Sequence, residues 1–289
     1  MLFECEGDRL VGIATLPNEP IQYGVLIVVG GPQYRSGSHR QFTLLARQLA
    51  DHGIASLRFD YRGMGDSEGA MRNFESIDAD IRAAIDTLMT TVPALKGVAI
   101  WGLCDAASAA MIYAHTDPRV SGLVLLNPWV HSQAAEAQAR LQRYYPSRLF
   151  NYDFWLKLAK FEVNVSTACL ELSRFLLQRK ARPDKHGAQK DFTERMLDGI
   201  TQFKGESLII LSDLEDLTAQ IFNSLMVNAP KWRELYQGPC ATCMTLNGAN
   251  HTFSSDIWRN QVGSWTITWI TDHLATPDQC RTCDHQDHA

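Results

Sequence analysis

The sequence predicts an α/β fold with a mostly parallel, doubly wound sheet and a helical cap inserted before the last strands. Short apolar runs alternate with amphipathic helical patterns up to about residue 128. The stretch 129–203 has helical patterns and no convincing strand, and strand patterns resume after it. We therefore expect a core domain in two parts, at 1–128 and 204–275. A cap at 129–203 would lie between these parts, and a tail at 276–289 would follow them.

Strand-like segments are short and apolar, and several are apolar throughout, which is typical of a parallel sheet that is buried on both faces. They are expected at 10–16, 23–29, 55–59, 98–101, 122–126, 207–211 and 242–246. Helical spacing of apolar residues predicts helices at 41–50, 74–90, 107–115 and 257–274. In such a sheet, ligands bind at the carboxyl ends of the strands, so we expect the functional residues in the loops that follow the strands.

Composition excludes several classes of function. The 289 residues are 45% hydrophobic and 20% charged, with a formal net charge of −5, which gives no reason to expect nucleic acid as a partner. No apolar run approaches the roughly 20 residues of a membrane helix, and the first residues lack a basic stretch followed by an apolar one. Seven cysteines, an odd number, do not resemble a secreted disulfide framework. We expect a cytoplasmic protein with reduced thiols.

Cys104 follows the apolar strand 98–101 in the run Gly-Leu-Cys-Asp-Ala at 102–106, and helix-forming residues come next. This order is typical of a nucleophile elbow, a strained turn that lifts a reactive side chain above the sheet and needs small residues on both sides. A lone cysteine is more often a buried structural residue. The catalytic interpretation of Cys104 therefore depends on whether other segments supply the remaining parts of a site.

Two further segments supply an acid and a base after the last strands. His251 lies just past the final predicted strand, where a general base would be expected. An acid that orients this base is expected after the strand ending at residue 211, where Asp216 has the better spacing and Asp213 is the second candidate. Cys104, Asp216 and His251 then follow one another in the chain order of the nucleophile, acid and histidine that accompany such an elbow.

A glycine turn, Gly-Gly-Pro-Gln at 30–33, follows an early strand and is suited to an oxyanion hole. Proline has no N–H, so the donor of this turn is expected to be Gly31 or Gln33. The second donor would be the backbone amide of Asp105, directly after the cysteine.

The loop Phe-Asp-Tyr-Arg-Gly-Met-Gly-Asp-Ser-Glu-Gly at 59–69, together with the glycine turn and the elbow, resembles the α/β-hydrolases associated with exosortase A systems, hydrolase group 1. The resemblance runs from about residue 23 to 274. It implies an α/β-hydrolase fold with a catalytic triad, and no particular substrate. The tail beyond residue 276 has no counterpart in this group.

A cysteine nucleophile favours activated acyl groups, because a thiolate is expelled more readily than an alkoxide from the tetrahedral intermediate of an ordinary ester. We therefore expect a thioesterase or acyltransferase that acts on a small-molecule or carrier-bound acyl substrate and requires no cofactor for catalysis. Basic residues after the glycine turn and in the cap could meet a phosphate of such a carrier, and these are Arg35, His39, Arg40, Arg140, Arg143 and Arg148. The alternatives are a lactone or ester hydrolase and, from another class, a non-catalytic binding protein on the same fold.

Two Cys-x-x-Cys units offer a second kind of site. Their cysteines could hold a structural zinc ion, because paired thiolates at this spacing are common zinc ligands and histidines lie nearby in the tail. The four cysteines are Cys240, Cys243, Cys280 and Cys283. Such a zinc ion would lie at the edge of the sheet opposite the catalytic residues and would have no catalytic role.

Overall fold

The computed structural model describes residues 1–31, 33–130, 191–213 and 216–275. These residues form an eight-stranded sheet with the order β1-β2-β4-β3-β5-β6-β7-β8. β2 is antiparallel to both of its neighbours, and the remaining pairs are parallel. The strands are β1 Leu2–Cys5, β2 Asp8–Thr15, β3 Tyr23–Val28, β4 Ser56–Asp60, β5 Gly97–Leu103, β6 Val120–Leu126, β7 Glu206–Leu211 and β8 Ala241–Thr245.

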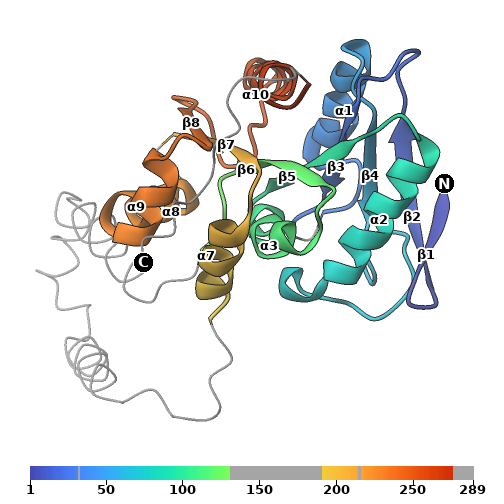
Figure 1. Cartoon of the computed structure of the whole chain (residues 1–289), viewed down its shortest axis with the longest axis horizontal. Helices are drawn as coiled ribbons and strands as arrows, with labels where there is room; N and C mark the ends of the chain where they lie inside the picture. The colour runs from blue at the N-terminus through green and yellow to red at the C-terminus, as the bar shows by residue number, and fades with distance from the viewer. Residues whose placement is uncertain (32, 131–190, 214–215, 276–289) are drawn as a thin grey trace, which may run out of the picture. The chain divides into compact units, whose positions relative to one another are not determined.

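Helices cover both faces of the sheet, with α1 and α10 in contact on one face and α2, α3 and α7 on the other (Figure 1). Their bounds are α1 Gln41–Asp51, α2 Asp78–Thr91, α3 Asp105–Tyr113, α7 Phe192–Gln202, α8 Leu217–Asn228, α9 Pro230–Gln237 and α10 Asp256–Trp269. Short helical turns lie at Ser38–Arg40, Phe74–Ser76, Ala114–Thr116 and Ile270–Ala275. The predicted doubly wound α/β fold is confirmed.

The central strands are buried because both of their faces are covered, and β3 and β5 are apolar as well. Every residue of β4 and β5 is buried, and the same holds for Val25, Leu26 and Ile27 of β3. Phe42 of α1 meets Trp101 of β5 edge to face, with ring centroids 5.6 Å apart. This rigid core fixes where each strand ends and therefore where the loops that follow the strands meet.

Contacts divide the chain into two compact units, one of residues 1–131 and 192–289 and the other of residues 132–191. Most of the predicted cap, residues 131–190, lies outside the described residues. Its described end, α7, belongs to the first unit and packs on α3. Gly199 makes this packing close, since a Cβ there would lie 2.2 Å from the carbonyl oxygen of Met111.

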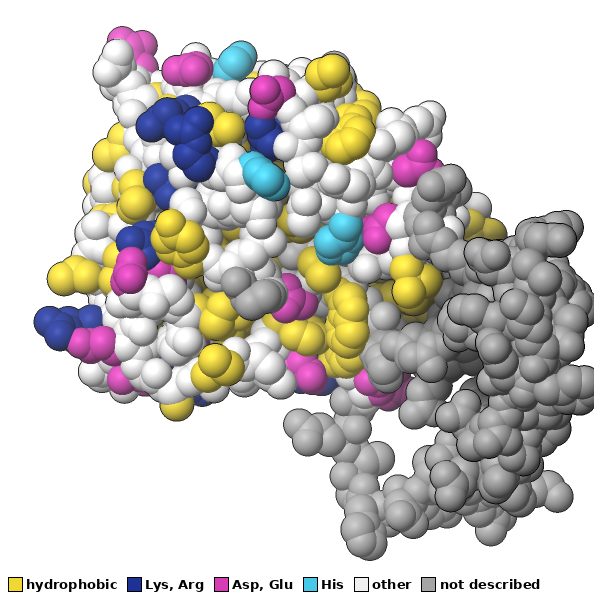
Figure 2. All heavy atoms as spheres, turned by 180° about the vertical axis from the view of Figure 1, so that it is seen from behind, with side chains coloured by type: hydrophobic (Ala, Val, Ile, Leu, Met, Phe, Trp, Pro, Cys, Tyr) yellow, Lys and Arg dark blue, Asp and Glu magenta, His cyan; other side chains and the backbone are white. Residues whose placement is uncertain are grey.

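The surface of the described residues carries both signs of charge. On the face seen in Figure 2, basic side chains gather toward one edge with acidic side chains near them, and apolar side chains are spread between. Within the described part of the chain, no helix is both long enough and apolar enough to cross a bilayer.

Candidate active site

Cys104 occupies a sharp turn between β5 and α3. Its backbone has φ +61° and ψ −124°, a strained conformation for a residue with a side chain. The turn requires a small residue on the strand side, because a Cβ on Gly102 would lie 2.6 Å from the backbone carbon of Ala106. The side chain of Cys104 is partly buried, and its interaction with His251 contributes to the raised pKa of that histidine. The turn thus has the geometry that the sequence pattern predicted.

His251 and Asp216 meet above the carboxyl ends of the last two strands. The Nδ1 atom of His251 lies 2.8 Å from Oδ2 of Asp216. Asp216 is also the N-cap of α8 and accepts hydrogen bonds from the hydroxyl of Ser212 and the amide of Ala219 at 3.2 and 3.3 Å. These contacts fix the carboxylate, and the fixed carboxylate orients the imidazole ring toward Cys104.

The electrostatics of this pair favour a charged imidazole. Burial alone lowers the pKa of His251, but its hydrogen bonds to Asp216 and Cys104 outweigh burial and raise the pKa to about 10. Burial would raise the pKa of Asp216, but the hydrogen bond and charge of His251 lower it overall. The arrangement therefore stabilises an imidazolium between two groups that can carry negative charge.

Asp213, the second candidate for the acid, lies elsewhere. Its Oδ2 atom accepts a hydrogen bond of 2.8 Å from the amide of Gly248, and its own amide donates to the carbonyl of Ala249. Asp213 thus ties the loop after β7 to the loop that carries the histidine. The carboxylate beside His251 is that of Asp216.

Asn127, which sequence reasoning did not single out, joins the two loops that carry His251 and Asp216. Its side-chain amide donates to the carbonyl of His251 at 2.9 Å, and its Oδ1 accepts from the amide of Ser212 at 2.8 Å. The side chain is fully buried, and its backbone φ of +41° is one that asparagine tolerates better than most residues. Its place directly after β6, at the carboxyl end of a buried strand, was the available signal.

The glycine turn lies against the elbow. The amide of Gly31, a predicted oxyanion donor, is 2.7 Å from Oδ1 of Asp105 and donates to it. The backbone amides of Asp105 and Ala106 also oppose the rise in pKa that burial causes in this carboxyl group. Gln33, the other candidate donor of the turn, lines the adjoining cavity. The structure thus brings Gly31, Gln33 and Asp105 together, with the Asp105 side chain bound to the amide of Gly31.

Arg35 anchors the segment that follows the glycine turn. Its amide donates to Oδ1 of Asp60 at 2.6 Å, and its guanidinium pairs with Asp60 and, at 2.7 Å, with Asp66. The Asp60 side chain is fully buried at the end of β4. Because Asp60 and Asp66 already pair with Arg35, its guanidinium would attract the phosphate of a carrier less strongly than an unpaired arginine would.

A cavity of about 610 Å³ opens beside the elbow. Aromatic and methionine side chains form much of its wall, and this composition suits an acyl chain. Its lining includes Gly31, Gln33, Tyr34, Tyr61, Met64, Met71, Phe74 and Asp105.

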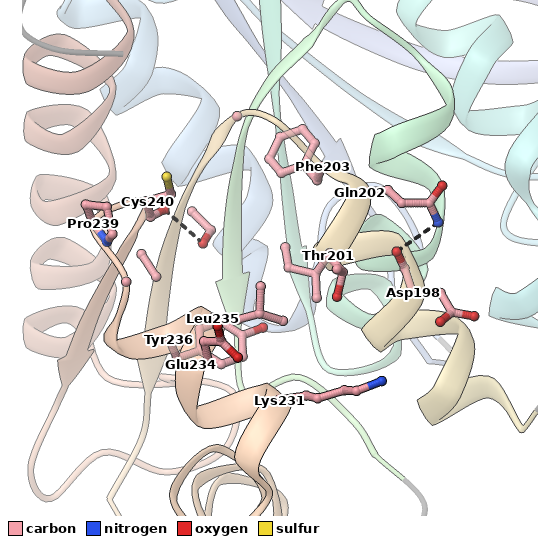
Figure 3. Close-up of a pocket in the computed structure, with 15 residues that line it drawn as sticks. Asp198, Thr201, Gln202, Phe203, Lys231, Glu234, Leu235, Tyr236, Pro239 and Cys240 are labelled. Carbon is pink, nitrogen blue, oxygen red and sulfur yellow. Dashed lines mark hydrogen bonds between the residues drawn. The ribbon is translucent and has the colours of Figure 1, made fainter. Parts of the chain in front are cut away.

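A second cavity, of about 400 Å³, lies between α7 and α9 where β7 and β8 begin, at the end of the sheet opposite Cys104 (Figure 3). Lys231 and Glu234 reach it from α9, and Asp198 and Gln202 reach it from α7. It lies away from the cysteine and the histidine, so we place the site at the first cavity.

The described half of the predicted zinc site does not bring two thiolates together. Cys243 lies within β8 and is exposed as a free thiol, whereas Cys240 precedes the strand and is disulfide-bonded. The prediction of reduced thiols is therefore wrong for Cys240, and a sulfur held in a disulfide cannot serve as a thiolate ligand. Cys280 and Cys283 lie outside the described residues, so zinc binding stays a prediction, and Cys240 and Cys243 do not fit one metal ion.

A mostly parallel sheet, a strained turn after a central strand, and an acid and a histidine after the last strands define an α/β hydrolase. The chain belongs to the family described as "Serine aminopeptidase, S33", whose model matches residues 24–171, just over half of the chain. It is thus a member of an enzymatic hydrolase family, and its elbow carries a cysteine.

Solved structures of the same fold include the esterase Pf2001 from Pyrococcus furiosus, with a TM-score of 0.61 at 14% identity over 95% of this chain and 90% of that chain. Est1E from Butyrivibrio proteoclasticus, solved with ferulic acid bound, has a TM-score of 0.62 at 16% identity over 96% of this chain and 100% of that chain. The α/β hydrolase GrgF from Penicillium sp. sh18 has a TM-score of 0.60 at 16% identity over 96% and 98%. At these identities the likeness is one of fold.

The relatives found by sequence match a smaller share of this chain than the solved structures do. Polyketide transferase grgF from Penicillium sp is 31% identical over 96 residues, which are 30% of this chain and 31% of the relative. The chain spans about a third to a half of the length of the curated relatives it matches.

Proposed function

We propose that this protein is an acyl-transfer enzyme with Cys104 as its nucleophile, acting on thioesters or similarly activated acyl groups. The observation that carries the proposal is the contact of His251 with both Cys104 and Asp216 at the strained turn. The polyketide transferase among the relatives and the esterases among the structural neighbours support acyl chemistry of this kind. Within the superfamily, the loop at 59–69 leads us to propose membership of the exosortase A system-associated group.

In the proposed reaction, the thiolate of Cys104 attacks the carbonyl carbon, and the C=O electron pair moves onto oxygen. Collapse of this tetrahedral intermediate re-forms the carbonyl and breaks the bond to the leaving thiolate, which takes a proton from the imidazolium of His251. Water, an amine or an alcohol then attacks the carbonyl carbon of the acyl-cysteine, with neutral His251 accepting its proton. This second tetrahedral intermediate collapses with cleavage of the bond to sulfur, so that the product leaves and Cys104 is restored as a thiolate beside the imidazolium. Asp216 keeps the imidazole aligned in both steps.

A thioester suits this nucleophile because its own leaving group is as good as the attacking thiolate. An ordinary ester would instead return to reactants, since the alkoxide is the poorer leaving group. A carrier-bound or small-molecule acyl group would enter through the cavity beside Tyr61 and Phe74. In a cytoplasmic location, as the sequence leads us to expect, Cys104 would stay reduced.

The test is acylation of one cysteine. Intact protein is incubated with a short acyl thioester and weighed, and we expect one added acyl group that is lost in Cys104→Ala and kept in Cys243→Ala, which removes an exposed free thiol distant from the site. No added mass in wild type would favour the non-catalytic binding protein. Cys104→Ser should lower thioester turnover, and equal or faster turnover by this variant would contradict a thiolate mechanism.

Two further measurements separate the remaining alternatives. Turnover of lactones or simple esters at a rate equal to that of thioesters would favour the lactone or ester hydrolase. Product analysis with added amines then distinguishes hydrolysis from transfer.

A further inference from the structure

The carboxylate of Asp105 occupies the place where a reacting oxyanion would be bound. The expected oxyanion donors of this site are the backbone N–H groups of Gly31 and Asp105, and the N–H of Gly31 donates to Oδ1 of Asp105 at 2.7 Å. In the structure, one of the two donors therefore already holds a carboxylate oxygen that belongs to the chain itself.

The backbone around Asp105 is shaped to admit this carboxylate. A Cβ on Gly30 would lie 2.4 Å from Oδ1 of Asp105 and 2.5 Å from the carbonyl oxygen of Leu103, so glycine is required where the turn passes the elbow. Asp105 is only partly buried and lines the cavity of about 610 Å³, which gives its side chain room to turn away. Tyr61 and Asn73 are among the polar residues that line the same space.

The charge of Asp105 is not neutralised by an ion pair with a basic side chain among the described contacts. Burial raises the pKa of Asp105, and its hydrogen bonds from backbone amides together with the charge of His251 oppose that rise only in part. Tyr61 lines the same cavity, and burial, followed by the charge of Asp105, raises the pKa of its phenol to about 12. A negative charge so close to the reacting carbonyl would oppose a developing oxyanion.

We propose that Asp105 is a specificity-determining residue whose carboxylate competes with the oxyanion of the substrate for the amide of Gly31. The inference rests on the proposed function of Cys104. Acyl groups react only when they displace the carboxylate into the cavity, so small acyl groups that bind weakly are turned over slowly. Larger acyl groups, whose contacts with the cavity wall can offset the displacement, are favoured.

The test compares Asp105→Asn and Asp105→Ala with wild type, using acetyl and octanoyl thioesters. Loss of one charge-assisted hydrogen bond should raise kcat/KM for the acetyl thioester about tenfold. The value for octanoyl should rise less, so that the preference for the longer chain shrinks. Asp256→Asn, which removes an exposed carboxylate on α10, is the matched control.

A second measurement does not depend on turnover. The thiolate of Cys104 attacks the carbonyl carbon of an aldehyde analogue of the substrate, and the C=O electron pair moves onto the aldehyde oxygen, which His251 can protonate. The adduct places that oxygen at the oxyanion donors. We expect about tenfold tighter inhibition of Asp105→Asn than of wild type.

The outcomes separate this inference from the proposed function. If Cys104 of wild type takes up no acyl group and no aldehyde, the proposed function fails. If it is acylated but both Asp105 variants react at the wild-type rate or more slowly, and bind the aldehyde no more tightly, then Asp105 only holds the glycine turn in place and the competition is refuted.

Discussion

Replacing Asn127 should both destabilise the fold and misalign the histidine. In Asn127→Ala, the amide of Ser212 and the carbonyl of His251 lose their partners, and the side chain lost is fully buried. Each orphaned group costs about 1–3 kcal/mol, so the free energy of unfolding should fall by about 2–6 kcal/mol. The whole stability of a domain is about 5–15 kcal/mol, so the loss is easily measured.

Two companion variants separate the causes. Asn127→Gly removes the same hydrogen bonds but relieves the strain of φ +41°, so it should be less destabilised than the alanine variant. Asn127→Asp keeps an acceptor for Ser212 but places a carboxylate oxygen against the carbonyl of His251, so it should lose most activity. Asn228→Ala, an exposed asparagine on α8, is the control.

The assay is urea unfolding, followed by thioester kinetics on folded protein. We expect kcat to fall by about tenfold or more while KM changes little, because the cavity wall is untouched but the imidazole is less well held. The pKa of His251, about 10 in the intact site, should fall as its contact with Asp216 loosens. An alanine variant within about 0.5 kcal/mol of wild type, with an unchanged kcat, would refute the reasoning.

Three other changes have defined outcomes. In Asp216→Asn, the pKa of His251, followed by NMR, should fall from about 10 toward its ordinary 6.5, because a charged partner is lost. Burial raises the pKa of Asp117, but hydrogen bonds from a neighbouring arginine and tyrosine outweigh it and lower the pKa from 3.8 to about 2. Its stabilisation is therefore present above pH 3.8 and lost as the pH falls through 2, so Asp117→Asn should cost about 2 kcal/mol at pH 7 and progressively less in acid. Gly199→Ala should lower stability by about 1–3 kcal/mol, because the added methyl group meets the carbonyl of Met111.

A different result would contradict each of these three predictions. A pKa of His251 that stays near 10 in Asp216→Asn would mean that another group holds the imidazolium. A cost of Asp117→Asn that does not change between pH 7 and pH 2 would assign its effect to packing. Wild-type stability of Gly199→Ala would show that α7 can shift away from α3.

The sheet was predictable because its central strands are apolar on both faces, as at 98–101 and 122–126. β1, at Leu2–Cys5, was not predicted, because it is a four-residue edge strand with alternating exposure and one neighbour. Helices α8 and α9 were also missed. Helix α9, Pro230–Gln237, buries only two side chains, so its apolar pattern is weak.

The residues of the candidate site were predictable where their order along the chain alone determines which edge of the sheet they reach. Cys104, Asp216 and His251 each follow a strand, and parallel strands deliver such residues to one edge. The choice between Asp216 and Asp213 depended on how the loop after β7 turns, which spacing does not determine. The roles of Asn127 and of the Asp105 carboxylate depend on side-chain contacts with loops far away in the chain, and the place of Asn127 directly after β6 was the one local signal for it.

The bonds that Asn127 makes have a consequence for how the protein acquires activity. They join residues 85 and 124 positions apart, and His251 meets an acid 35 positions earlier. Contacts of such long range form late, after the intervening chain has been threaded into the sheet. Thiol reactivity at Cys104 should therefore report the final stage of refolding, and a nascent chain released before β8 should carry an inert cysteine.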